Sequence, residues 1–60
     1  MTIYLVIECD ENVYGETGYR AIVPKRIVSG HTDKNEAEYA LEECVEEGGF
    51  EPYITTVEVE

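Results

Sequence analysis

The sequence predicts an α+β fold in a single domain, residues 1–60, with one amphipathic helix packed on one face of an antiparallel sheet. Three observations support this prediction. Apolar residues alternate with polar ones near both ends of the chain, as they do in strands, and recur at helical spacing in residues 37–45. Glycine and proline lie between these segments, where the chain has to turn. The predicted order of elements is βββαβ.

The first two predicted strands form a hairpin with a long acidic tip. In residues 2–10, one face of the strand carries Ile3, Leu5, Ile7 and Cys9. Residues 10–18 contain two glycines, an asparagine and three acids, a composition typical of loops. The second strand covers residues 19–23 and ends at Pro24, which cannot donate a hydrogen bond to a strand ladder. Residues 27–29 form a short third strand.

One helix and a last strand complete the predicted fold. The helix begins at Asp33, with Glu36 three residues later as in a capping box, although Thr32 is an alternative N-cap. Its apolar stripe consists of Ala37, Ala40, Leu41, Cys44 and Val45. Residues 48–49 are glycines that end the helix, and residues 53–60 form the last strand.

These periodicities assign a core face and an outer face to the sheet. The predicted core consists of Ile3, Leu5, Ile7, Ala21, Val23, Ile27, Leu41, Cys44, Val45, Phe50 and Val57. The outer face would carry Tyr4, Val6, Ile22 and Ile54, a large apolar surface for a monomer to expose. A homodimer or another partner would cover this surface. Alternatively, these four residues are present only because they favour strands, and the outer face is exposed to solvent.

The charge balance excludes several classes of protein. The chain has 14 acidic and 4 basic residues, a formal net charge of −10. Direct nucleic-acid binding needs a surplus of Lys and Arg, and an anionic membrane surface would repel such a chain. A hydrophobic content of 43% is too high for a disordered acidic tail. The N-terminal apolar run is too short for a signal peptide or a spanning helix, so we expect a cytoplasmic protein with free thiols.

The side of the predicted helix opposite the apolar stripe is strongly acidic. Glutamates four residues apart repel each other there, and Glu46 and Glu47 lie in the last turn, where the helix dipole favours cations. Tyr39, of a residue type that anchors interfaces, lies among them. We therefore predict a partner-binding face of Glu38, Tyr39, Glu42, Glu43, Glu46 and Glu47. A solvated face that only confers solubility, or a halophilic origin, would explain the same charges.

The residues that could carry chemistry form no recognisable catalytic or metal-binding set. His31 is the only histidine, and Cys9 and Cys44 fit small core residues in an electronegative chain. The hairpin tip matches a calcium-binding loop from Asp10 only in part, because Ala21 stands where the bidentate acid belongs. We therefore expect no enzyme, no cofactor and no metal site. A small enzyme or metal protein built on His31 and the hairpin acids is a further hypothesis.

Most of the chain resembles a known family, through short motifs. Residues 18–24 read Gly-Tyr-Arg-Ala-Ile-Val-Pro and are followed by Gly30, Thr32 and a helix that opens with Glu36–Ala37. This pattern resembles the N-terminal domain of HicB-like antitoxins, which has a βββαβ, partial RNase H-like fold without nuclease activity. The resemblance implies binding and neutralisation of a small basic RNA-cleaving toxin. The segment between Pro24 and Gly30 is shorter than in that family, and we expect no DNA-binding domain and hence no autoregulation.

Two functional hypotheses follow. In the first, the protein is a small acidic non-enzymatic inhibitor of a basic nucleic-acid-handling protein, acting through the glutamate-rich helix face. This inhibitor would be antitoxin-like or a phage-type nucleic-acid mimic. In the alternative, it is a structural or regulatory homodimer that associates through the outer sheet face, and its acidic helix face only confers solubility.

Overall fold

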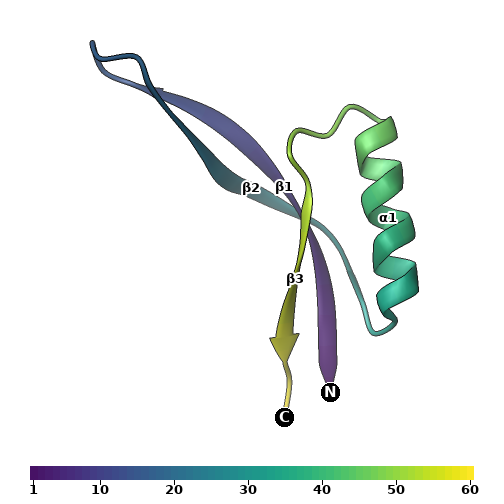
Figure 1. Cartoon of the computed structure of the whole chain (residues 1–60). Coiled ribbons are helices and arrows are strands. Elements are labelled where there is room, and N and C mark those ends of the chain that lie inside the picture. The colour runs from purple at the N-terminus through teal and green to yellow at the C-terminus, as the bar shows by residue number, and fades with distance from the viewer.

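The computed structural model describes residues 1–60 and contains β1 (Thr2–Tyr14), β2 (Tyr19–His31), α1 (Lys34–Glu46) and β3 (Tyr53–Glu58). β1 occupies the centre of an antiparallel sheet of order β2-β1-β3, and α1 contacts all three strands. In Figure 1 the helix lies against one face of the sheet, and no other element covers the opposite face. The predicted α+β class is confirmed. The structure contains no helix with the length and apolar character needed to cross a membrane.

The order of elements is ββαβ, because two predicted strands form one. Residues 19–23 and 27–29 both belong to β2, which continues through Pro24. Two register shifts leave Lys25 and Val28 without a partner on β1, and such bulges absorb extra residues without ending a strand. A proline is tolerated here because β2 is an edge strand, where one side of the backbone needs no partner.

The hairpin tip is shorter than predicted, and its strands are longer. β1 continues to Tyr14, and only residues 15–18 form the turn, in which Gly15 and Gly18 have φ of 57° and 70°. Only glycine adopts this left-handed region freely. An ion pair of 3.2 Å between Glu11 and Arg20 joins the two strands near the turn. We call residues 10–23 the arm, since β3 pairs only with residues 2–7 of β1. In Figure 1 the arm projects beyond the sheet and bends away from α1.

The helix begins and ends where the sequence predicts. Asp33 is the N-cap, and its carboxylate accepts a hydrogen bond of 2.7 Å from the amide of Asn35. At the other end Gly48 has φ of 89°, its amide donates to the carbonyl of Val45, and the amide of Gly49 donates to the carbonyl of Cys44. This pair of hydrogen bonds is the Schellman motif, which satisfies carbonyls at the end of a helix.

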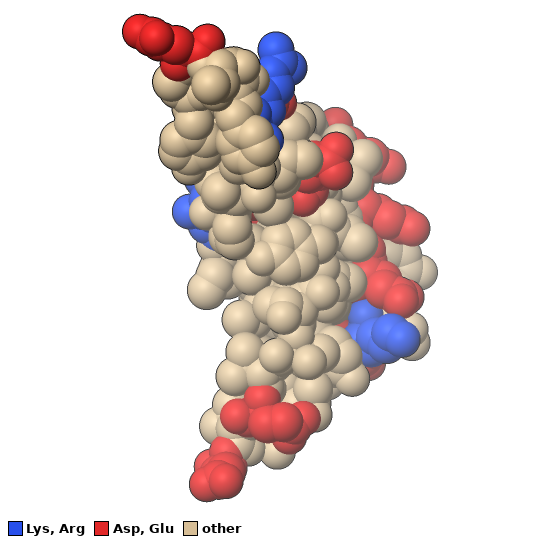
Figure 2. Space-filling view, turned by 60° about the vertical axis from the view of Figure 1, so that its left-hand side comes forward, with Lys and Arg blue, Asp and Glu red and all other residues tan.

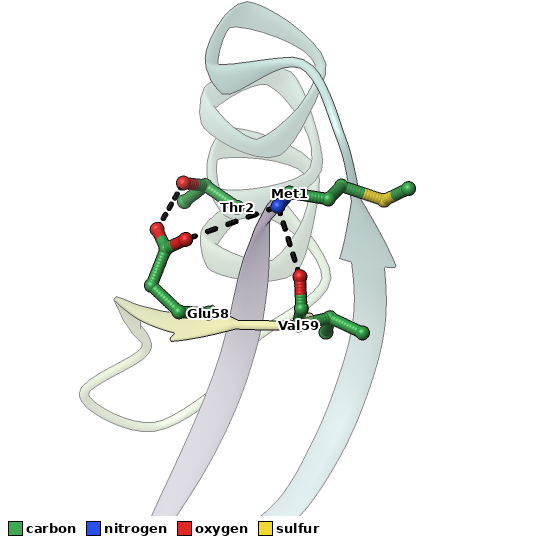
Figure 3. Close-up of polar contacts among 4 residues, drawn as sticks. All are labelled: Met1, Thr2, Glu58 and Val59. Carbon is green, nitrogen blue, oxygen red and sulfur yellow. Dashed lines mark hydrogen bonds and ion pairs between the residues drawn. The ribbon is translucent and has the colours of Figure 1, made fainter.

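The N-terminal end of β1 is tied to the end of β3 (Figure 3). The ammonium group of Met1 donates to the carbonyl of Val59 at 2.9 Å and lies 3.9 Å from a carboxylate oxygen of Glu58. The other carboxylate oxygen of Glu58 accepts a hydrogen bond from the hydroxyl of Thr2. The antiparallel pairing of β1 with β3 thus continues beyond the last residue of β3.

Two contacts identify the face of the sheet that α1 covers. At the first turn of the helix, Oε2 of Glu36 lies 4.0 Å from Nδ1 of His31 on β2. Beyond the last turn, a Cβ built on Gly49 would lie 3.1 Å from Oε2 of Glu8 on β1. Val6 points to the same side of β1 as Glu8 and is 0% exposed. The even-numbered side chains of β1 in residues 4–8 therefore lie under the helix.

The predicted assignment of the two sheet faces is wrong. Val6, Tyr4 and Ile54 were expected on the outer face, yet Val6 is buried and the other two are half-buried on the helix side. The buried residues are Val6, Cys9, Ala37 and Cys44. Of the other predicted core residues, Ala21, Val23 and Leu41 are half-buried, and Val45 and Phe50 are exposed. The face expected in the core is open, and it carries Ile3, Leu5, Ile7, Ile27 and Val57.

The handedness of the chain explains this reversal. β2 and β3 are both antiparallel to β1, so they are parallel to each other, and α1 connects them. Such crossovers are right-handed in nearly all proteins. Figure 1 shows this sense, with the chain descending β2, rising through α1 and descending β3. Handedness therefore allows α1 only one of the two faces, although both faces of β1 are apolar.

Candidate interaction surfaces

The exposed side of α1 forms the first candidate surface, which we call the glutamate face. It consists of Glu38, Tyr39, Glu42, Glu43, Glu46 and Glu47, all of them exposed. None of its carboxylates lies within 4.0 Å of a basic group. The four ion pairs of the structure all involve other acidic residues. The last turn of the helix contains no basic residue. In Figure 2 acidic side chains run along the side of the molecule where α1 lies.

The glutamate face reduces the stability of its own helix. The pairs Glu38/Glu42, Glu42/Glu46 and Glu43/Glu47 are like charges four residues apart, each costing about 0.2–0.5 kcal/mol. Glu46 and Glu47 add a cost of about 0.3–1 kcal/mol each, because they lie at the negative end of the helix dipole. No ion pair within the chain offsets these costs.

Tyr39 occupies the middle of the glutamate face. Its side chain is 70% exposed. Together with Asn35, Glu38 and Glu42 it lines a shallow open depression on the helix surface. Tyr39 lies within about one helical turn of each of the other three, so the aromatic ring and two carboxylates present a single surface to solvent.

The structure does not bring together the four residues predicted to form the outer sheet face. Val6 is in the core, and Tyr4 and Ile54 lie beside it. Ile22 is exposed but lies in the arm, opposite Glu11. These four residues therefore form no continuous surface.

The uncovered side of the sheet is the second candidate surface, which we call the open face. It carries Ile3, Leu5, Ile7, Ile27, Tyr53 and Val57, which face one another across the three strands. Ile27 is 62% exposed, and Tyr53 and Val57 are exposed as well. Alternation in the sequence does not reveal this surface, because it predicts five of these six residues in the core and leaves Tyr53 out. The right-handed crossover rule would have found it once the strand order was known.

A polar pair lies on the helix side of the sheet, near the end of α1. Nε of Arg26 donates to Oε1 of Glu8 at 2.9 Å across β1 and β2. This hydrogen bond lowers the pKa of Glu8 and raises that of Arg26, and the attraction between the two charges acts in the same direction. Burial and the nearby Asp10 raise the pKa of Glu8, without reversing the shift.

The remaining titratable residues of the sequence analysis lie apart from one another. Nε2 of His31 is 2.8 Å from the hydroxyl of Ser29, and both cysteines are buried free thiols. Among the hairpin acids, Asp10 accepts a hydrogen bond from the amide of Glu11. Nowhere do three or more His, Cys, Asp or Glu side chains gather in a way that could hold a metal ion.

Comparison of the chain with protein-family models, curated proteins and solved structures gave no match.

Proposed function

We propose that this protein is a small acidic, non-enzymatic inhibitor that binds and neutralises a basic nucleic-acid-handling protein through the glutamate face. One observation carries the proposal: five exposed glutamates share one side of α1, and none forms an ion pair within the chain. A surface that only confers solubility would be more stable with lysines among the acids. A basic partner would supply these missing cations.

The spacing of the charges suits a partner that binds nucleic acid. Glu38 and Glu47 are about 14 Å apart along the helix axis at 1.5 Å per residue. Five charges over this length give one charge per about 3 Å of helix axis, close to the 3.4 Å of duplex axis per phosphate of one strand. A protein surface built to bind phosphates therefore meets a similar density of negative charge on α1.

Tyr39 adds an anchor that charge alone does not provide. Complementary charges increase the rate of association and orient the two proteins, whereas buried aromatic side chains commonly contribute most of the binding energy. Tyr39 is exposed in the free protein and has carboxylates on both sides. Binding would bury its ring against the partner.

The resemblance of residues 18–24 and the helix start to HicB-like antitoxins supports the antitoxin-like form of the proposal. In this form the partner is a small basic RNA-cleaving protein. The second form is a nucleic-acid mimic that occupies the binding groove of a DNA- or RNA-binding protein. Both forms use the same residues of the glutamate face, and the identity of the partner distinguishes them.

Affinity capture from a nuclease-treated lysate of the source organism, at low and high salt, tests the proposal. The test variant is Glu42→Lys with Glu46→Lys, and the control is Glu16→Lys with Glu60→Lys, which changes the net charge equally away from α1. We expect the wild type and the control to capture one basic protein at low salt, and the test variant to lose it. Equal capture by test variant and control would overturn the proposal.

The captured protein then permits a direct test of inhibition and of the anchor. The wild type should block the nucleic-acid binding or cleavage activity of the partner. Tyr39→Ala should weaken binding by about 30-fold, the effect of losing a central aromatic contact of about 2 kcal/mol. An affinity unchanged by Tyr39→Ala would contradict the assigned role of Tyr39.

A further inference from the structure

The isolated chain exposes more surface than a compact monomer of its size. Its accessible surface is 4572 Å². A folded monomer of 6.8 kDa is expected to expose about 4,000 Å². The excess is about 600 Å², and only 4 of 60 residues are buried. The chain therefore exposes some surface that a compact single-domain protein of this size would bury.

The open face contributes exposed apolar side chains to this surface, among them Ile27, Tyr53 and Val57, and contains no charge at its centre. The three rows across the sheet read Val57–Ile3, Thr55–Leu5–Gly30 and Tyr53–Ile7–Ile27. A Cβ at Gly30 would lie 3.2 Å from Leu5 and 3.7 Å from Ile3, so the glycine leaves room for these side chains to lie flat. Figure 2 shows an uncharged surface along the middle of the molecule, with acidic groups towards its ends.

We propose that the open face is the interface of a homodimer, in which a second copy of the chain packs its own open face against the first. The resulting assembly has four layers, with two sheets inside and two helices outside. The inference goes beyond the inhibitor function and does not rest on it, because both glutamate faces remain exposed.

The charge of the chain favours a second copy in this arrangement. With a net charge of −10, two copies repel each other over most of their surfaces. A two-fold contact places the same patch on both sides, and the rows at the centre of the open face carry no charge. The two sheets, about 10 Å apart, then separate the two glutamate faces by more than the Debye length of about 8 Å at physiological salt.

The excess accessible surface is also large enough for a dimer interface. If each chain covers its excess of about 600 Å², the dimer buries about 1,200 Å² in total, the lower end of the range for specific interfaces. Face-to-face packing of two sheets needs interdigitating apolar side chains. Every strand of the open face supplies at least one: isoleucine and leucine on β1, isoleucine on β2 and valine on β3.

The arm gives a second reason to expect another copy of the chain on the open face. An isolated two-stranded hairpin is only marginally stable, and the arm exposes Val13 and Ile22 on one of its faces and Tyr14 and Tyr19 on the other. In Figure 1 it bends away from α1, towards the side of the open face. A second copy seated on the open face comes within reach of the arm. One partner can thus cover the open face together with one face of the arm.

Sedimentation equilibrium of the full chain at physiological salt tests the dimer. We expect a mass of twice 6.8 kDa at high-micromolar concentration. Because a dimer is stabilised by mass action, its Tm should also rise with protein concentration. A monomeric mass together with a Tm independent of concentration would overturn the proposal.

Two matched variants then test the face. Ile27→Lys alters the open face, and Val45→Lys alters a residue of α1 that is 56% exposed, with the same change in net charge. We expect Ile27→Lys to be monomeric, with a Tm independent of concentration, and Val45→Lys to remain dimeric. Val57→Lys repeats the test on β3 should Ile27→Lys fail to fold. Dimers that persist in both open-face variants, or dissociate in Val45→Lys, would contradict the assigned interface.

Discussion

Glu8 accepts a hydrogen bond of 2.9 Å from Arg26 across the pair β1–β2, at the point where the chain leaves α1. A Cβ added at Gly49, in the loop that follows the helix, would lie 3.1 Å from Oε2 of this carboxylate. The side chain of Glu8 is mostly buried, whereas that of Arg26 is mostly exposed. An ionised acid thus lies on the helix side of the sheet, held by one cation of the edge strand.

We predict that Glu8→Gln lowers the Tm at neutral pH and has progressively less effect in acid. Arg26 holds the pKa of Glu8 below its ordinary value of 4.5, so the folded state favours the ionised form. The pair contributes its full stabilisation of the fold at a pH above this ordinary value. This stabilisation is lost as the pH falls through the lower pKa that Glu8 has in the folded protein. Thermal unfolding of both proteins between pH 7 and pH 2 measures the difference.

Glu16→Gln is the control, because it removes the same charge from the turn, where Glu16 makes no ion pair. It should leave the Tm at neutral pH close to that of the wild type. A Tm difference between Glu8→Gln and wild type that stays constant down to the lowest pH would show that ionisation of Glu8 does not stabilise the fold.

The helix could be predicted from sequence almost completely, because its signals are local. Asp33, the apolar stripe and Gly48 each act within one or two turns of the chain, so no knowledge of other elements is needed. The glutamate face follows from the same periodicity, since it is the side opposite the stripe. The structure adds that its carboxylates lack ion pairs within the chain.

The sheet could be predicted only in outline. The passage of β2 through Pro24 depends on two bulges against β1, and the covered face depends on the crossover between β2 and β3. Both are properties of pairs of strands distant in sequence. Alternation in β1 is also ambiguous, because Val6 on one face and Leu5 on the other are both strongly apolar. Alternation alone therefore predicts that the residues of the open face lie in the core.

We predict that Val6→Ala destabilises the protein by about 2 kcal/mol, the usual range for removing two buried methyl groups and leaving a cavity. Val6 is the largest fully buried side chain and lies between the sheet and α1. Val45→Ala, on the exposed side of the helix end, should change stability by less than about 0.5 kcal/mol. Urea unfolding measures both, and equal effects would contradict the assignment of the covered face.

We predict that Gly49→Ala is destabilising by about 1–3 kcal/mol, the usual cost of forcing an extra methyl group into packed surroundings. Its Cβ would lie 2.7 Å from the carbonyl oxygen of Cys44, which accepts the hydrogen bond that ends the helix. Gly48→Asn is the comparison, because Gly48 has open space around it and asparagine tolerates its positive φ. Chemical denaturation should rank Gly49→Ala as clearly the less stable variant.

We predict that Glu46→Lys and Glu47→Lys each stabilise the fold by about 0.5 kcal/mol or more at low salt while weakening capture of the basic partner. Each substitution removes a repulsion four residues away and places a cation at the negative end of the helix dipole. The gain in Tm should shrink as salt is added, since these groups are exposed. Glu60→Lys, outside the helix, is the control for net charge. A surface kept for solubility alone would let both lysine variants gain stability without losing any binding partner. Opposite effects on stability and binding would instead show that the repulsion within the helix is retained for recognition.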